Sequence, residues 1–181
     1  MSAMRVVTEG RPTMDAIWAA LAAIPDPEIP VISLVELGIV REVCWRGDEL
    51  VVTLTPTYSG CPATEVITAD VAAALVDAGI VGARIETRLS PAWTTDWMAP
   101  AAKTRLAEYG IAPPGTRAGV EPGVQAINIG GLTRREPAAP VPCPRCGSRR
   151  TRELSRFGST PCKAQHRCED CLEPFDYFKP H

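Results

Sequence analysis

The sequence predicts an α+β protein made of a small N-terminal body and a separate C-terminal module. Three observations lead to this prediction. Helical and strand-like hydrophobic periods alternate over residues 13–110 in the order α-β-β-α-β-α. Proline and glycine then crowd residues 111–142, and two C-x-x-C pairs follow within residues 143–181. We therefore expect a mixed sheet with helices on one face, a linker or packing arm, and a metal-binding module.

The first helix is expected to begin after Thr13 and to end before Pro25. Thr13 can cap the helix, and Asp15 suits its positive N-terminal end. An apolar stripe at helical spacing follows: Ile17, Trp18, Leu21 and Ile24. Three prolines in residues 25–30 then predict a stiff, open loop that carries Asp26 and Glu28. Nothing on such a loop would separate the pKa values of the two carboxylates, so we do not expect acid–base catalysis from them.

Residues 39–45 and 50–55 are rich in β-formers and are joined by four residues, which predicts a β-hairpin. A second helix is expected from Pro62, at the first helical position, to Ala78, before Gly79. Residues 80–89 alternate in polarity and predict a third strand with one solvated face. A third helix is expected over residues 101–109, with Gly110 just past its end.

Charge is distributed unevenly along the 181 residues, whose net charge is only −2. Residues 13–100 hold 4 basic and 12 acidic side chains, whereas residues 141–181 hold 8 basic and 5 acidic ones. This balance argues against a chain that wraps nucleic acid along its length. The apolar run of residues 16–24 is about half the ~20 residues that a bilayer requires, and its flanks do not resemble a signal peptide. We expect a cytoplasmic protein with reduced thiols.

Four cysteines in two C-x-x-C pairs predict a metal site in the tail: Cys143, Cys146, Cys168 and Cys171. Two such tight turns can form a closed cage of four thiolates, which indicates a structural zinc ribbon. Between the two pairs, residues 151–155 are expected to form a strand. A rubredoxin-like iron or a labile iron–sulfur site is the alternative, because four cysteines accept either metal class. Cys162 is a fifth thiol in the same module. It is either a packed free thiol or a spare ligand or transfer thiol.

Cys61 stands one residue before Pro62, at the start of the second predicted helix. N–H groups at a helix start favour a thiolate, which is the form that binds metal or attacks. The preceding residues Tyr58, Ser59 and Gly60 allow a tight turn. The alternative is that Cys61 takes the N-cap position of the helix.

The chain lacks the usual residue sets of an enzyme. It has no Ser/His/Asp arrangement, phosphate loop or dinucleotide fingerprint, and both histidines, His166 and His181, lie in the tail. We assign no catalytic residue. The basic tail could contact nucleic acid, but a protein partner with an acidic patch is the prediction that we favour.

Two motifs resemble the iron–sulfur assembly family that includes the cytosolic iron–sulfur targeting factors and the bacterial SufT proteins. They are residues 26–30 (DPEIP) and 55–62 (TPTYSGCP), and the resemblance extends over residues 13–110. With residues 143–148 (CPRCGS), 157–164 (FGSTPCKA) and 173–179 (EPFDYFK), the whole chain is similar to the PaaD family. That family comprises the D subunits of bacterial phenylacetyl-coenzyme A epoxidase systems.

The resemblance implies an accessory subunit, with no catalysis of its own, that matures or inserts an iron or iron–sulfur centre in its partners. Cys61 would be the reactive cysteine, and Asp26 with Glu28 the acidic loop motif. Our leading hypothesis adds Cys162 as a further thiol that holds iron transiently. The implied partners are the oxygenase and reductase components of the epoxidase, the iron–sulfur assembly machinery and a second copy of the chain. The competing hypotheses are a structural subunit that clamps the oxygenase, direct participation in ring epoxidation, and a nucleic-acid-binding zinc ribbon.

Overall fold

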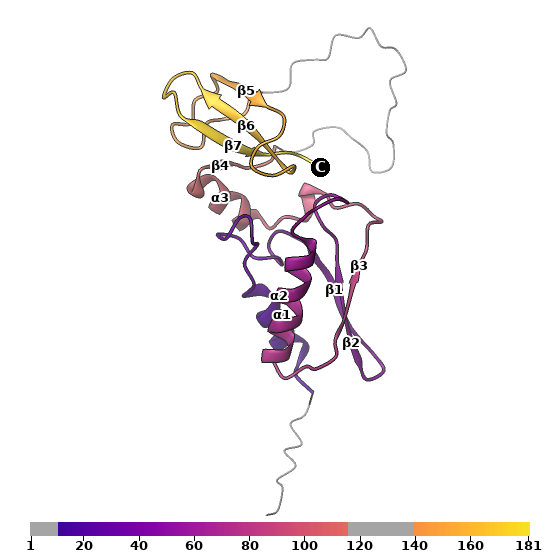
Figure 1. Ribbon diagram of the computed structural model, residues 1–181. Coiled ribbons are helices and arrows are strands. Elements are labelled where there is room, and N and C mark those ends of the chain that lie inside the picture. The colour runs from indigo at the N-terminus through magenta and orange to yellow at the C-terminus, as the bar shows by residue number, and fades with distance from the viewer. Residues whose placement is uncertain (1–10, 116–139) are drawn as a thin grey trace, which may run out of the picture. The chain divides into compact units, whose positions relative to one another are not determined.

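The computed structural model describes residues 11–115 and 140–181, which form two units (Figure 1). The first unit contains the described residues up to Pro56 together with Pro62–Pro91. The second contains Thr57–Cys61 and the described residues from Ala92 to His181. The predicted linker or packing arm, residues 111–142, lies mostly outside the described residues.

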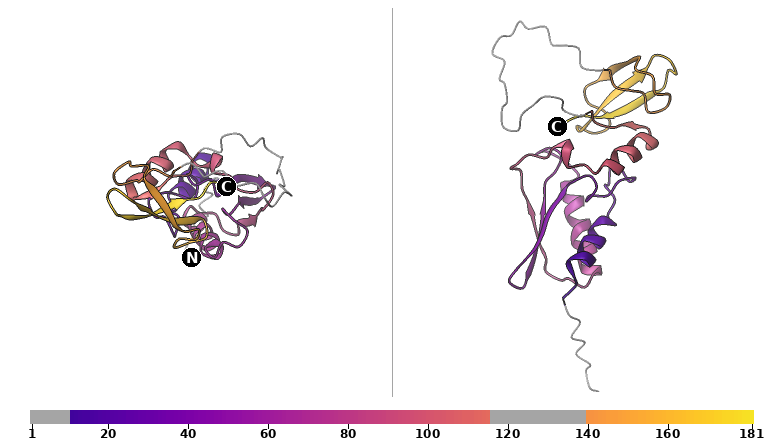
Figure 2. Two further views of the ribbon diagram at one scale, coloured as in Figure 1. Left: turned by 90° about the horizontal axis from the view of Figure 1, so that it is seen from above. Right: turned by 180° about the vertical axis from the view of Figure 1, so that it is seen from behind.

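In the first unit, two helices cover one face of a three-stranded mixed sheet, as predicted. Helix α1 (Met14–Ala22) and helix α2 (Thr64–Asp77) lie on the same side of strands β1 (Val40–Arg46), β2 (Glu49–Leu54) and β3 (Arg84–Thr87) (Figures 1 and 2). The strand order is β1-β2-β3, with β1 antiparallel and β3 parallel to β2. The parallel pairing follows from the α2 crossover between β2 and β3.

Local sequence signals account for the helix ends. The Thr13 side chain accepts a hydrogen bond from the Ala16 N–H at 3.2 Å, which confirms the predicted cap of α1. Helix α2 begins two residues later than expected, with Ala63 at the N-cap and no side-chain cap. The faces of the helices that meet the sheet are buried: Ile17, Leu21, Ile67, Val71 and Leu75. No helix in the described part of the chain is long and apolar enough to cross a membrane.

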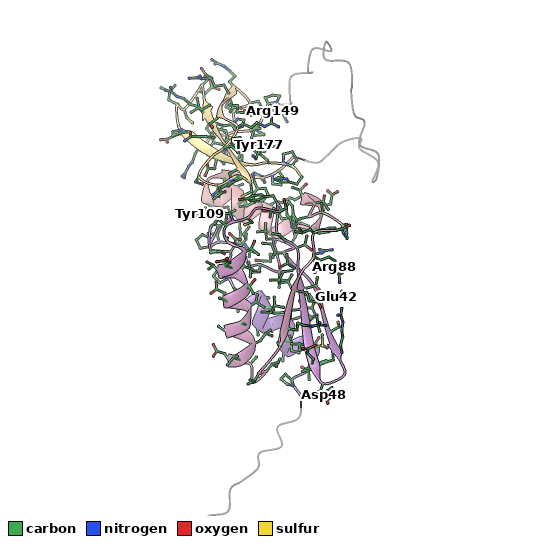
Figure 3. All side chains as sticks on the ribbon, turned by 45° about the vertical axis from the view of Figure 1, so that its right-hand side comes forward. Glu42, Asp48, Arg88, Tyr109, Arg149 and Tyr177 are labelled. Atoms are coloured by element: carbon green, nitrogen blue, oxygen red, sulfur yellow. The ribbon has the colours of Figure 1, made fainter. Side chains whose placement is uncertain are left out.

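Ion pairs cover the other face of this sheet. Two pairs reach across the central strand: Arg46 of β1 with Glu86 of β3 at 3.4 Å, and Arg88, just past β3, with Glu42 of β1 at 3.1 Å (Figure 3). Arg84 of β3 pairs at 3.2 Å with Glu49 of β2 and with Glu86 of its own strand. Beneath them, Val51 and Thr53 of the central strand are 0% and 1% exposed. The predicted solvated face of the third strand is therefore a layer of charged side chains whose stems cover β2.

The third strand is shorter than residues 80–89, the range that the alternation predicts. Only Arg84–Thr87 pairs with β2. Gly79 and Gly82 both have positive φ, which turns the chain before the strand, and Leu89 beyond it is 53% exposed.

The second unit contains a four-stranded sheet in the order β4-β7-β6-β5. Its elements are η1 (Thr95–Trp97), α3 (Pro100–Tyr109), β4 (Ile111–Ala112), β5 (Thr151–Ser155), β6 (Lys163–Cys168) and β7 (Pro174–Phe178). The predicted third helix is confirmed, and so is a strand over residues 151–155. Ile111–Ala112 pairs in parallel with β7, so the first residues of the predicted linker form a strand. Trp93 packs against Phe178 with the ring centroids 5.9 Å apart.

Gly110 ends α3 with a φ of 99°, and replacing it with alanine is expected to destabilise the protein. A Cβ atom there would lie 2.9 Å from Nη2 of Arg145, the far end of a flexible side chain that can move aside, so the left-handed backbone carries the main cost. We expect Gly110→Ala to lower the free energy of unfolding by about 1–2 kcal/mol in denaturant titrations.

Gly47→Ala is the matched control for Gly110→Ala. Gly47 has a φ of 65°, and no atom lies within 4 Å of the place that a Cβ would take, so this variant reports the backbone cost alone. Equal losses in the two variants would show that crowding against Arg145 contributes nothing.

Candidate functional site

Four cysteine sulfurs converge in the second unit, as the two C-x-x-C pairs predict. The Sγ atoms of Cys143, Cys146, Cys168 and Cys171 all lie within 4.8 Å of one another. Sγ of Cys143 is 3.7 Å from that of Cys171, and Sγ of Cys146 is 3.6 Å from that of Cys168. A tetrahedral ion with metal–sulfur bonds of about 2.3 Å requires sulfur–sulfur distances of about 3.8 Å. The four thiols therefore fit one metal ion better than a cluster, whose several irons would hold the sulfurs farther apart.

Two tight turns hold these sulfurs in place. In the first, the Gly147 N–H donates to the Cys143 carbonyl at 2.8 Å, and Gly147 has a φ of 74°. In the second, the Cys171 N–H points at Sγ of Cys168 at 3.5 Å, and the chain turns at Leu172 with a φ of 65°. The spacing of each pair thus places one cysteine before the turn and the other within it.

The electrostatics of the cage favour a bound cation. The N–H of Cys171 lowers the pKa of Cys168 to about 7. The Glu173 N–H also lowers the pKa of Cys171, but burial and the neighbouring thiols outweigh it and raise that pKa to about 12. A thiolate therefore forms readily at Cys168, and the neighbouring thiols oppose a second one at Cys171. A divalent ion removes that opposition.

A small apolar cluster surrounds the cage. Its buried members are Ala112, Cys143, Cys168 and Phe175, with Val141 and Tyr177 packed against them (Figure 3 labels Tyr177). His166 lies beside this cluster, stacked on Phe175 and edge-on to Tyr177, with centroid distances of 5.7 and 5.4 Å. Burial lowers the pKa of His166, although Glu153 partly opposes the shift. His166 is a packed neutral side chain and is not one of the four grouped ligands.

Cys61 lies on a tight turn and is half-buried. Its N–H donates to the Tyr58 carbonyl at 3.3 Å, and Ser59 and Gly60 between them are exposed. Cys61 stands three residues before the first residue of α2, and Ala63 is the N-cap. The alternative that Cys61 caps the helix is therefore wrong, because the helix starts later than Pro62 suggests. The reactivity of this thiol remains a prediction.

Asp26 is buried, which corrects the expectation of an open acidic loop. It is 5% exposed, and its Oδ1 accepts the N–H groups of Glu28 at 2.9 Å and Ile29 at 2.8 Å. Its own N–H donates to the Ile32 carbonyl at 2.9 Å. Glu28 is half-buried. The acidic motif belongs to the first unit, whereas Thr57–Cys61 belongs to the second.

Cys162 lies outside the four-sulfur cage. It is 5% exposed, and its Sγ is 3.0 Å from the Thr160 hydroxyl. The structure thus places it as a packed thiol, and a transient role as an iron ligand remains a prediction.

Sequence reasoning missed a buried lysine near Cys162. Lys163 is 4% exposed, and its Nζ lies 3.8 Å from Asp176, which also accepts a hydrogen bond from Ser159. A Cβ on Gly158 would lie 2.9 Å from the Asp176 carboxylate. Residues 157–164 held the available sequence signal for this ion pair. Gly158 and Ser159 are small, so the loop can lie against Lys163 and Asp176.

Comparisons with known proteins place the chain in a family. Residues 14–83 match the family described as iron–sulfur cluster assembly protein, and residues 130–179 match the PaaD zinc beta ribbon domain. A protein of Escherichia coli (strain K12) is 46% identical over 175 residues, which are 97% of this chain and 98% of that protein. Its provisional name makes it the D subunit of a 1,2-phenylacetyl-CoA epoxidase. The chain belongs to the PaaD family.

Shorter relatives match about half of this PaaD-family chain. The Fe-S protein maturation auxiliary factor of Porphyromonas gingivalis is 34% identical over 96 residues, 52% of this chain and 90% of that protein. The factor YitW of Bacillus subtilis (strain 168) is 37% identical over 92 residues, 50% and 89% of the two chains. A crystal structure of a domain of unknown function, DUF59, from Bacillus anthracis matches with a TM-score of 0.47 at 29% identity. The match covers 51% of this chain and 89% of that one.

Proposed function

We propose that this protein is an accessory subunit of a phenylacetyl-CoA epoxidase system that matures or inserts an iron or iron–sulfur centre in its partner subunits. Two relatives support this proposal by their names, one as an epoxidase subunit and one as an Fe-S protein maturation factor. The observation that carries it is Cys61, a half-buried thiol on a tight turn within the segment that matches the iron–sulfur assembly family.

In this proposal, Cys61 holds iron or a cluster only in transit, as cargo. A thiolate on a short turn can bind a soft metal and release it to a site with more ligands. Ser59 and Gly60, the two residues before Cys61, are small and exposed. The recipients are the oxygenase and reductase components, and the cytoplasm is the compartment that keeps such a thiol reduced.

The four-cysteine cage has a different role in this proposal. Cys143, Cys146, Cys168 and Cys171 would hold a zinc ion that fixes the two turns of the ribbon. Four protein ligands complete its coordination, so this zinc is structural. The ribbon then serves to dock the protein that receives the cargo.

Cys61→Ser tests the delivery role. We expect the co-expressed reductase and oxygenase to lose most of their bound iron, because serine is a poor ligand for soft metals. Iron and acid-labile sulfide in the purified partners are the measurement. Cys44→Ser, at a half-buried cysteine on β1, is the matched control and should leave loading unchanged.

Full metal loading in both partners with Cys61→Ser would reject delivery by this thiol. It would favour the second candidate, a structural subunit that clamps the oxygenase, which the name of the Escherichia coli relative as an epoxidase subunit supports. In that case the partners would still co-purify with the Cys61→Ser variant.

A further inference from the structure

Arginines lie close together where β5 and β6 approach the metal cage. The strand register pairs Arg152 directly with Arg167, so both side chains extend from the same face of the sheet. Directly opposed like charges destabilise a strand pair. Arg152 pairs with Glu169 at 2.8 Å, whereas Arg167 donates only to the Leu172 carbonyl, at 3.3 Å, and has no carboxylate partner among the described residues.

Arg150, just before β5, extends this arrangement. It pairs with Asp170 at 2.8 Å, and its carbonyl accepts the Glu169 N–H at 2.7 Å. The side chains of Arg150 and Arg152 are 74% and 58% exposed. Arg150, Arg152 and Arg167 are called the arginine surface below. Exposed ion pairs contribute little to stability, so carboxylates from another molecule can replace Glu169 and Asp170.

We propose that the arginine surface binds an acidic segment of a protein partner. The repulsion between Arg152 and Arg167 destabilises the folded ribbon. An incoming carboxylate that bridges the two guanidinium groups removes this repulsion. Guanidinium groups suit this task because they bind carboxylates through two parallel hydrogen bonds. The basic balance of residues 141–181, 8 basic against 5 acidic side chains, favours the same partner.

Apolar side chains beside the arginine surface favour a protein over a nucleic acid. Leu172 is 59% exposed and is held next to Arg167 through its carbonyl. Leu154 is 44% exposed at a bulge in β5, which is an edge strand of its sheet. Arginine with exposed apolar residues is typical of protein interfaces.

This inference rests on the proposed function in one respect: it identifies the partner as the protein to which the ribbon docks. The acidic segment would belong to the oxygenase or the reductase. The role of Cys61 in carrying metal is a separate claim, so the two can fail separately.

Arg167→Glu in the full-length, zinc-loaded chain tests the proposal. The probe is a dye-labelled peptide of alternating glutamate and leucine, with a glutamine–leucine peptide for comparison. We expect wild type to bind the glutamate peptide in a salt-sensitive way, and Arg167→Glu to weaken binding about tenfold or more. The melting temperature should stay the same or rise, because the introduced carboxylate would face Arg152. Lys103→Glu on α3 makes the same charge change elsewhere and should leave affinity unchanged.

Several outcomes would contradict the proposal that the arginine surface binds an acidic segment. They are equal peptide affinity in wild type and Arg167→Glu, no preference for the glutamate peptide, tighter binding of a single-stranded DNA of equal length, or self-association of the chain that Arg167→Glu abolishes. Cys61→Ser separates the two claims: it should bind the peptide normally. If it also loads both partners fully, the delivery role fails and the arginine surface stands.

Discussion

Replacing Cys168 with serine is expected to release the metal ion and to unfold the ribbon formed by β5, β6 and β7. Cys168 is 0% exposed, and it belongs both to the sulfur cage and to the small apolar cluster beside it. Four-thiolate zinc binding is worth about 10–16 kcal/mol in small zinc domains. A cluster with only four buried members cannot replace that contribution. Metal content per chain and protease resistance of residues 140–181 are the measurements.

Cys162→Ser is the control for this loss. Cys162 is also buried but lies outside the cage, so the variant should retain one metal ion per chain. If Cys168→Ser kept its metal and its protease resistance, the ribbon would be stable without the cage. If Cys162→Ser lost metal, Cys162 would be a ligand and the four-cysteine assignment would be wrong.

Short-range signals explain what could be predicted from the sequence. The Thr13 cap, the left-handed Gly110 and the four ligands in C-x-x-C pairs each depend on residues a few positions apart. Such features are encoded within one turn of chain, so spacing and residue type suffice to locate them. The same reason explains why the strand over residues 151–155 could be predicted.

The features that sequence reasoning missed depend on strand pairing, turns and loop folding that local polarity patterns do not mark. The pairing of Ile111–Ala112 with β7 joins segments more than 60 residues apart, and no local pattern marks it. The shortened third strand reflects the turn at Gly82, which alternation of polarity does not reveal. The burial of Asp26 likewise depends on how the loop folds onto Ile29 and Ile32, since prolines alone suggested an open loop.

Those contacts decide how the acidic motif should be interpreted. Asp26 is a structural acceptor, because one carboxylate oxygen receives two backbone N–H groups of its own loop. Glu28 supplies one of those N–H groups, and its side chain is half-buried. The two carboxylates of this motif look equivalent in the sequence, but the structure gives them different surroundings. Mutations at the two positions should have different effects.

Asp26→Ala is expected to lower the free energy of unfolding by about 1–3 kcal/mol. It leaves the Glu28 N–H without its acceptor, and it leaves the Ile29 N–H with only the longer bond to the carbonyl of residue 26, at 3.3 Å. Asp26→Asn keeps an oxygen acceptor and should lose about half as much. Glu28→Ala, the matched control, keeps the Asp26 carboxylate and both N–H groups that it accepts, so it should lose less stability than Asp26→Ala. Denaturant titration of the three variants tests this order. If Asp26→Ala were as stable as wild type yet failed to load iron into the partners, Asp26 would act on the cargo instead of holding the loop.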